Sequence, residues 1–255
     1  MYIQAKVTKA AYAAVLAGAL LGVSMPVSTN AGSRLLDRTT PKGGISNVLA
    51  KPAPDEVENS IGAVARAQAS VEGELGGDRR DLERDLPVFE NEEVTTGKNA
   101  RAVLRFLDGS VLTIGADAEV ILDDYVYGNS GGVITLIKGA LRFTSGKMGR
   151  LGLKIKMPVA TIGIRGTDFW AGEIDGGYGV LLMHGEVDVT NEAGTVTLSE
   201  PHEGTFIAAD GSAPGAVAIW EDGIQEKALA AVAFPNGPLC TVLQKVAKGL
   251  FNSCI

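Results

Sequence analysis

The side chains that usually carry catalysis are few in this sequence, and their spacing fits no common catalytic arrangement. The chain has two histidines, His184 and His202, and neither stands in the His-x-x-x-His or His-Glu-x-x-His spacing of a catalytic zinc site. The Gly-x-Ser-x-Gly turn that exposes a nucleophilic serine is absent as well. We therefore expect no enzymatic activity, no metal and no cofactor, and a hydrolase is the weakest of the functional hypotheses.

Several aspartates are better explained by structure than by chemistry. Asp123 and Asp124 are adjacent in a predicted strand, so their side chains point to opposite faces and do not easily share a proton or an ion. Asp108, Asp175 and Asp210 each precede a glycine, which is typical of tight turns.

One arginine stands in an unusual setting, because Arg165 lies between Gly163 and Gly166 at the end of an apolar strand. A guanidinium there could bind a carboxylate ligand. A structural role fits the spacing better, since the glycines permit a bulge or a close backbone approach, and Arg165 can then donate to turn carbonyls or to a neighbouring carboxylate. On that interpretation Arg165→Ala would cost about 1–3 kcal/mol of stability by leaving acceptors unpaired.

The first 31 residues are typical of a secretory signal peptide. They contain Lys6 and Lys9, no acidic residue, and an uncharged stretch from Ala10 to Ala31 that ends in small residues. We expect cleavage near Ala31 and a periplasmic or secreted mature protein. The alternative is an uncleaved membrane anchor, for which the glycines and Pro26 make a poor span.

The two cysteines, Cys240 and Cys254, form an even pair in a chain that we expect to be exported, so a disulfide between them is one interpretation. Apolar residues recur at helical spacing from Leu239 to Leu250, and an unbroken helix would hold the two cysteines about 21 Å apart. A disulfide therefore requires the helix to end near Gly249. Two separate thiols are the alternative.

Composition limits the class of partner. The chain carries 30 Asp and Glu residues against 23 Lys and Arg, a formal charge of −7, and this acidic balance argues against nucleic acid. Its 33 glycines follow no collagen period and indicate many tight turns.

The chain divides into a leader, a β-rich region and a helical end. Residues 32–60 contain proline, glycine and serine without any period and predict a flexible leader. Residues 61–219 show short alternating runs at about ten-residue spacing, which predict an all-β fold: a rolled antiparallel sheet, a sandwich or a solenoid. Residues 220–255 change to helical spacing and predict two C-terminal helices.

Two details of the β-rich region bear on its surface. Ala102, Leu104 and Phe106 alternate with Arg101 and Arg105, so we expect the arginines on the outward face of one strand. The charge-dense segment from residue 78 to 85 predicts a solvated loop or a short turn of helix.

Several motifs between residues 94 and 189 resemble the FecR domain family, a family of exported β-rich modules. They are Val94–Gly97, Ala102–Ser110, Ile137–Leu141 and Met157–Phe169, and Gly185–Val189 resembles the strand that follows them in this family. The likeness covers about residues 61–210 and implies a FecR-type β-domain. Its signature falls here on Asp108, Gly109, Ser110, Gly139, Gly163, Arg165, Gly166, Thr167 and Phe169, to which we assign structural roles.

Two functions from different classes are compatible with this resemblance. The first is a non-enzymatic exported module that binds an envelope protein or a glycan, identity open. The second is a membrane-tethered FecR-type regulator of transport-coupled, iron-uptake signalling. Regulators of that type carry a cytoplasmic segment before a membrane helix, whereas only nine residues precede Ala10 here. We therefore favour the first, and expect membrane association only if the N-terminal segment stays uncleaved.

Overall fold

The structure is a computed structural model that describes residues 59–124, 131–146 and 152–235. The described residues belong to one compact unit of the chain and form eighteen strands and one helix. No helix among them is long and apolar enough to cross a membrane.

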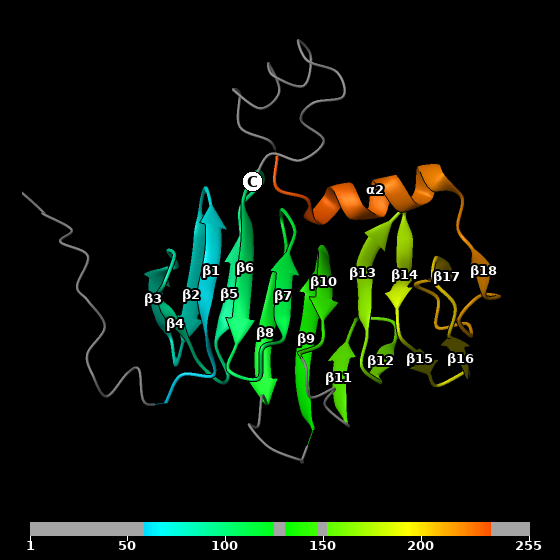
Figure 1. Ribbon diagram of the computed structural model, residues 1–255, viewed down its shortest axis with the longest axis horizontal. Helices are drawn as coiled ribbons and strands as arrows, with labels where there is room; N and C mark the ends of the chain where they lie inside the picture. The colour runs from blue at the N-terminus through cyan, green and yellow to red at the C-terminus, as the bar shows by residue number, and fades with distance from the viewer. Residues whose placement is uncertain (1–58, 125–130, 147–151, 236–255) are drawn as a thin grey trace, which may run out of the picture. The chain divides into compact units, whose positions relative to one another are not determined.

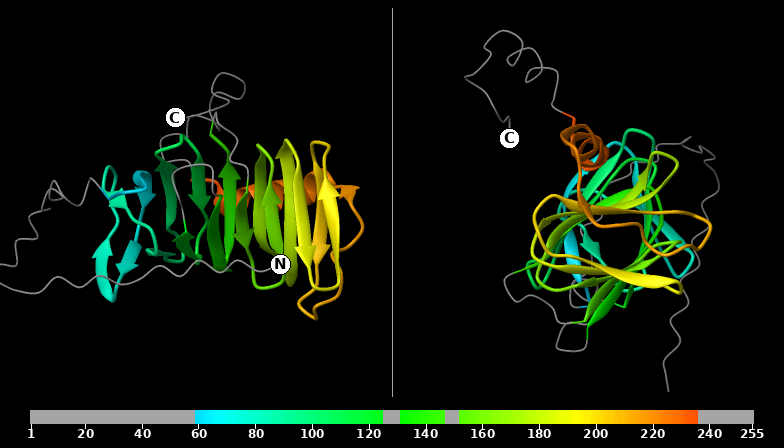
Figure 2. Two further views of the ribbon diagram at one scale, coloured as in Figure 1. Left: turned by 90° about the horizontal axis from the view of Figure 1, so that it is seen from below. Right: turned by 90° about the vertical axis from the view of Figure 1, so that its right-hand side faces the viewer.

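The strands form two sheets of nine strands each, which face one another (Figures 1 and 2). Sheet A contains, in spatial order, β18 (Ala218–Ile219), β17 (Glu203–Ile207), β14 (Gly177–His184), β13 (Asp168–Ile174), β10 (Ala140–Thr144), β7 (Val111–Ile114), β6 (Arg101–Phe106), β1 (Gly62–Gln68) and β4 (Pro87–Val88). Sheet B contains β16 (Gly194–Leu198), β15 (Val187–Asn191), β12 (Thr161–Ile164), β11 (Leu153–Lys156), β9 (Gly132–Lys138), β8 (Glu119–Asp124), β5 (Glu93–Thr96), β2 (Val71–Leu75) and β3 (Asp78–Asp81).

The chain winds between the two sheets, crossing at two opposite rims, so that the β-domain is a roll. Neighbouring strands are antiparallel except for the parallel pair β9 and β11. Between these two the chain passes through β10 in the other sheet, so it completes one full coil and returns in the original direction. The expected all-β roll is therefore present, and its antiparallel character is interrupted at this one pair.

The alternation in the sequence explains which side chains fill the roll. In β6, Ala102, Leu104 and Phe106 are buried while Arg105 is exposed, because successive side chains of a strand point to opposite faces. The inward residues of both sheets form one continuous core, whose largest fully buried members include Phe143, Phe169, Leu82, Leu104, Leu112, Ile114, Leu122, Ile134, Leu136 and Leu141.

A second apolar cluster lies outside the roll, where helix α2 (Asp222–Val232) covers part of the outer face of sheet A (Figure 1). Trp220 precedes the helix and lies over Gly179 and Gly204, two positions where a Cβ atom would collide with its indole ring. Phe206 stacks on Trp220 with ring centroids 4.7 Å apart, and Trp170 meets it edge-on at 6.3 Å. The absence of side chains at two strand positions thus creates the seat for Trp220.

Two sequence predictions differ from the structure. Residues 78–81, expected in a loop or a turn of helix, form strand β3, because Gly76 and Gly77 with positive φ turn β2 back on itself. Their charges find partners in this hairpin and beside it: Arg79 pairs with Glu74, and Arg80 with the fully buried Glu92. Of the two expected C-terminal helices, the structure has α2, and the second lies outside the described residues.

Trp220 provides a test of how firmly α2 is attached. We expect Trp220→Ala to lower the free energy of unfolding by about 3–5 kcal/mol, because a large buried ring is removed from a seat that backbone atoms cannot refill. Ile219→Ala, at an adjacent residue that is 71% exposed, should change it by less than about 0.5 kcal/mol. Urea denaturation followed by circular dichroism measures both, and similar losses in the two variants would contradict this packing.

Candidate functional site

Five of the nine residues of the family signature lie along one rim of the roll, where turns from consecutive coils stack on one another: Asp108, Gly109, Ser110, Gly166 and Thr167. The turn between β6 and β7 is closed by Asp108, whose carboxylate accepts hydrogen bonds from the backbone and the hydroxyl of Ser110. Gly109 takes a φ of +82° there, a conformation that favours glycine. The Ser110 hydroxyl in turn accepts a hydrogen bond from the backbone N–H of Gly146 at 3.0 Å.

The stack continues through Thr167. Its N–H donates to the Ser145 hydroxyl at 3.0 Å, and its carbonyl accepts from the Ser145 N–H at 2.8 Å. Gly185, in the turn after β14, lies against Gly166 and Thr167 so closely that a Cβ atom there would collide with the Gly166 carbonyl oxygen. The hydroxyls of Ser110 and Ser145 thus join one turn to the next along the rim.

The remaining signature residues have separate places. Gly139, with φ +86°, lies on the opposite rim against the backbone of Ala118, and Phe169 is fully buried beside Phe143. Gly163 lies in an unbroken part of the β12–β15 ladder, where a Cβ atom would meet nothing closer than 3.9 Å. Gly163 therefore makes neither the bulge nor the close approach expected for it, and the tight contact belongs to Gly185.

Arg165 is held by two carboxylates of the neighbouring chain segment. It donates to Glu186 Oε1 and to Asp188 Oδ2, each at 2.7 Å. Its side chain is 61% exposed, and both carboxylates are partly exposed, so water can replace these bonds if Arg165 is removed. The expected loss of 1–3 kcal/mol, which assumed buried acceptors, is accordingly too large.

A second ion pair supports the same rim. Arg142 donates to both carboxylate oxygens of Asp168, at 2.8 and 2.6 Å, and the Thr144 hydroxyl reaches the same carboxylate. Hydrogen bonding to Asp168 raises the pKa of Arg142 above its ordinary value, in spite of partial burial. This arginine therefore stays charged and is occupied within the fold.

The other candidates from the sequence give no catalytic constellation. His184 stands at the end of β14, and the ring of His202 lies 2.5 Å from the Gln225 side chain. Among the described residues, no group of three or more His, Cys, Asp or Glu side chains is placed to hold a metal ion. Cys240 and Cys254 lie outside the described residues.

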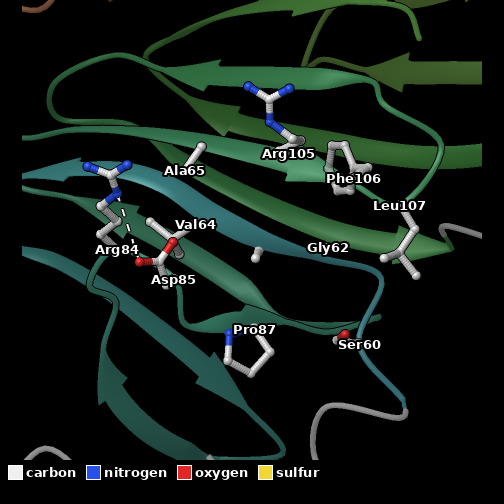
Figure 3. Close-up of a pocket in the computed structure, with 11 residues that line it drawn as sticks. Ser60, Gly62, Val64, Ala65, Arg84, Asp85, Pro87, Arg105, Phe106 and Leu107 are labelled. Carbon is white, nitrogen blue, oxygen red and sulfur yellow. Dashed lines mark ion pairs between the residues drawn. The ribbon is translucent and has the colours of Figure 1, made fainter. Parts of the chain in front are cut away.

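A groove with both charged and apolar walls lies at the N-terminal end of the roll (Figure 3). Its volume is about 660 Å³, and its floor is formed by small residues of β1, among them Ala63 and Ala65. Arg105 projects from β6 on one side, and Arg84 with Asp85 forms the other (Figure 3). The residues that line it are Ser60, Gly62, Ala63, Val64, Ala65, Arg84, Asp85, Pro87, Arg105, Phe106 and Leu107.

The sequence predicts one wall of the groove but not the other. Alternation in β6 places Arg105 outward, and this signal is present in the run from Arg101 to Phe106. The opposite wall depends on the two-residue strand β4, Pro87–Val88, which pairs with Gly62 and Ala63 of β1. A strand of two residues has no detectable period, so nothing in the sequence pairs it with β1.

Comparison with known proteins agrees with this arrangement. The family model described as FecR protein matches residues 92–188, which contain all nine signature residues. Residues 92–188 are a FecR domain. No curated protein matches the chain.

Two solved structures are similar to the chain, both described as a "putative anti-sigma factor" from Parabacteroides distasonis. The first, at 1.65 Å resolution, has 16% identity and a TM-score of 0.45, with 60% of this chain and 72% of that chain covered. The second, at 2.50 Å, has 14% identity and a TM-score of 0.45, with 64% of this chain and 81% of that chain covered.

The packing of the turns along the rim leads us to expect different losses of stability when Gly185 and Gly163 are substituted. Gly185→Ala should lower the free energy of unfolding by at least about 2 kcal/mol, because alanine is strained at a φ of +88° and its Cβ atom meets the next turn. Gly163→Ala should change it by less than about 0.5 kcal/mol, because the position is open. Chemical denaturation of the two variants side by side tests this, and equal stability would refute the stacked rim.

The ion pairs predict a similar contrast between two arginines. Arg165→Ala should cost less than about 1 kcal/mol, because all three charges remain hydrated. Arg80→Ala should cost about 3–5 kcal/mol, because it leaves the fully buried Glu92 carboxylate without its partner. Melting temperatures and urea midpoints measure both changes, and a larger loss for Arg165→Ala would show that its role is misassigned.

Proposed function

We propose that this protein is a non-enzymatic, exported binding module of the bacterial cell envelope, which holds a partner on the outer face of its FecR-containing roll. The observation that carries the proposal is the N-terminal groove of about 660 Å³, with a floor of small side chains and charged walls. Leu107, 60% exposed, stands at this groove and offers an apolar contact to a partner. Exposed apolar side chains beside polar walls are typical of interaction sites.

The rigidity of the surrounding fold supports a binding role. The groove is built on β1 and β6, whose inward residues belong to the continuous core of the roll. A preformed surface of this kind loses little conformational entropy when a partner binds. The partner we expect is an envelope protein, with a glycan as the alternative.

Site-specific crosslinking in cells tests this proposal. We expect a photo-crosslinking amino acid at position 107 to give a discrete adduct in the envelope fraction. The same group at Thr195, which is exposed on the outer face of sheet B, should give none. No adduct at position 107, or equal adducts at both, would contradict a partner in the groove.

Export is tested separately by the mature N-terminus. We expect mass spectrometry of the native protein to show a chain that begins within a few residues of Gly32, because an uncharged stretch with small residues at its end precedes that position. An intact Met1 in the membrane fraction would instead favour the tethered regulator.

A further inference from the structure

We propose that the partner of this surface is an acidic protein segment in extended conformation, bound along β6 and the N-terminal groove by Arg101, Arg105 and Arg66. These three residues are called the arginine face below. The inference rests on the proposed function, since it specifies the chemistry of the partner that the groove would hold.

The distribution of ion pairs sets this face apart. Among the described residues, five arginines have a carboxylate partner: Arg79, Arg80, Arg84, Arg142 and Arg165. Within the same described part of the chain, the three without one are Arg66, Arg101 and Arg105, all on the adjacent strands β1 and β6. In a chain with a net charge of −7, unpaired arginines collected on two neighbouring strands are a local excess of positive charge.

The positions of these arginines suit an extended ligand. Arg101 and Arg105 project outward from the same strand with Val103 between them, so their Cα atoms are separated by about 13 Å. Arg66, on β1, lies opposite Val103 of β6 in the pairing of these two strands. A strand with carboxylates on one side, separated by small or apolar residues, has matching periodicity because its own side chains alternate in the same way.

The neighbouring side chains do not compensate these charges. Arg66 lies over the ring of Phe234, with its guanidinium carbon 4.0 Å from the ring centroid. Arg101 donates through Nη1 to the carbonyl of Ala100 and has no carboxylate partner in the described structure. The face therefore keeps donors and positive charge to offer to a carboxylate ligand.

Charge also discriminates against other polyanions. The chain as a whole carries a net charge of −7, to which Glu72, Glu74 and Glu93 on sheet B contribute, so its long-range field repels a broad anionic surface. A narrow peptide can contact the arginine face without approaching these carboxylates. We therefore favour a protein segment over an anionic lipid surface.

Binding of a defined peptide to the purified mature protein tests this inference. The probe is a fluorescein-labelled peptide of about eight residues that alternates glutamate with valine or serine, and its control replaces every glutamate by glutamine. Fluorescence anisotropy should show binding of the glutamate peptide alone, weakening with salt. Each of Arg101→Gln and Arg105→Gln should lower the affinity about fivefold, and the double variant should lower it more.

The matched control is Arg79→Gln, which removes the same charge from an exposed arginine on sheet B and should change the affinity less than about twofold. Equal affinity for the two peptides, or no effect of the double substitution, would overturn the inference. Binding to phosphatidylglycerol vesicles instead of the peptide would assign the face to lipid, and self-association abolished by the double variant would assign it to a second copy. Either result also overturns it.

The crosslinking experiment separates this inference from the proposed function. An adduct at position 107 that survives in the Arg101→Gln/Arg105→Gln variant would leave the binding module intact but remove the acidic partner. Absence of the adduct in the wild-type background would remove both.

Discussion

The β-domain depends on the close stacking of turns along one rim of the roll. Consecutive coils are joined by hydrogen bonds between Ser110 and Gly146 and between Ser145 and Thr167, and Gly185 packs closely against Gly166. Glycine is required at Gly185 because no Cβ atom fits there. These contacts fix the distance between coils at the rim, so the two sheets keep the register that aligns their inward side chains.

The outer face of sheet A has two parts that differ in their side chains. Over part of β10, β13 and β14 the outward residues are apolar, among them Ala140, Trp170, Ile174 and Leu181, and they pack with residues of α2. Over β1 and β6 the outward positions hold arginines and small residues. In rolls of this kind each coil contacts mainly its neighbours, so the surface residues at one end can change without altering the packing at the other end.

Sequence periodicity predicts most of this architecture and little of its surface. The alternation of Arg101 to Phe106 is confirmed in β6, because one face of that strand is buried. The strand character of Asp78–Asp81 was missed, because its charges are compensated by residues distant in sequence, such as Glu92. The groove was missed for a related reason: its second wall requires the pairing of β4 with β1, which no local pattern encodes.

The seat of Trp220 has a consequence for spectroscopy. The chain contains two tryptophans, Trp170 and Trp220, and both lie where α2 meets sheet A rather than in the interior of the roll. Tryptophan fluorescence therefore reports on the contact between α2 and sheet A. The core between the two sheets contains no tryptophan. If the helix detaches before the sheets open, the emission will change while the β-sheet circular dichroism does not. The protein thus carries a built-in optical probe for the docking of its helix.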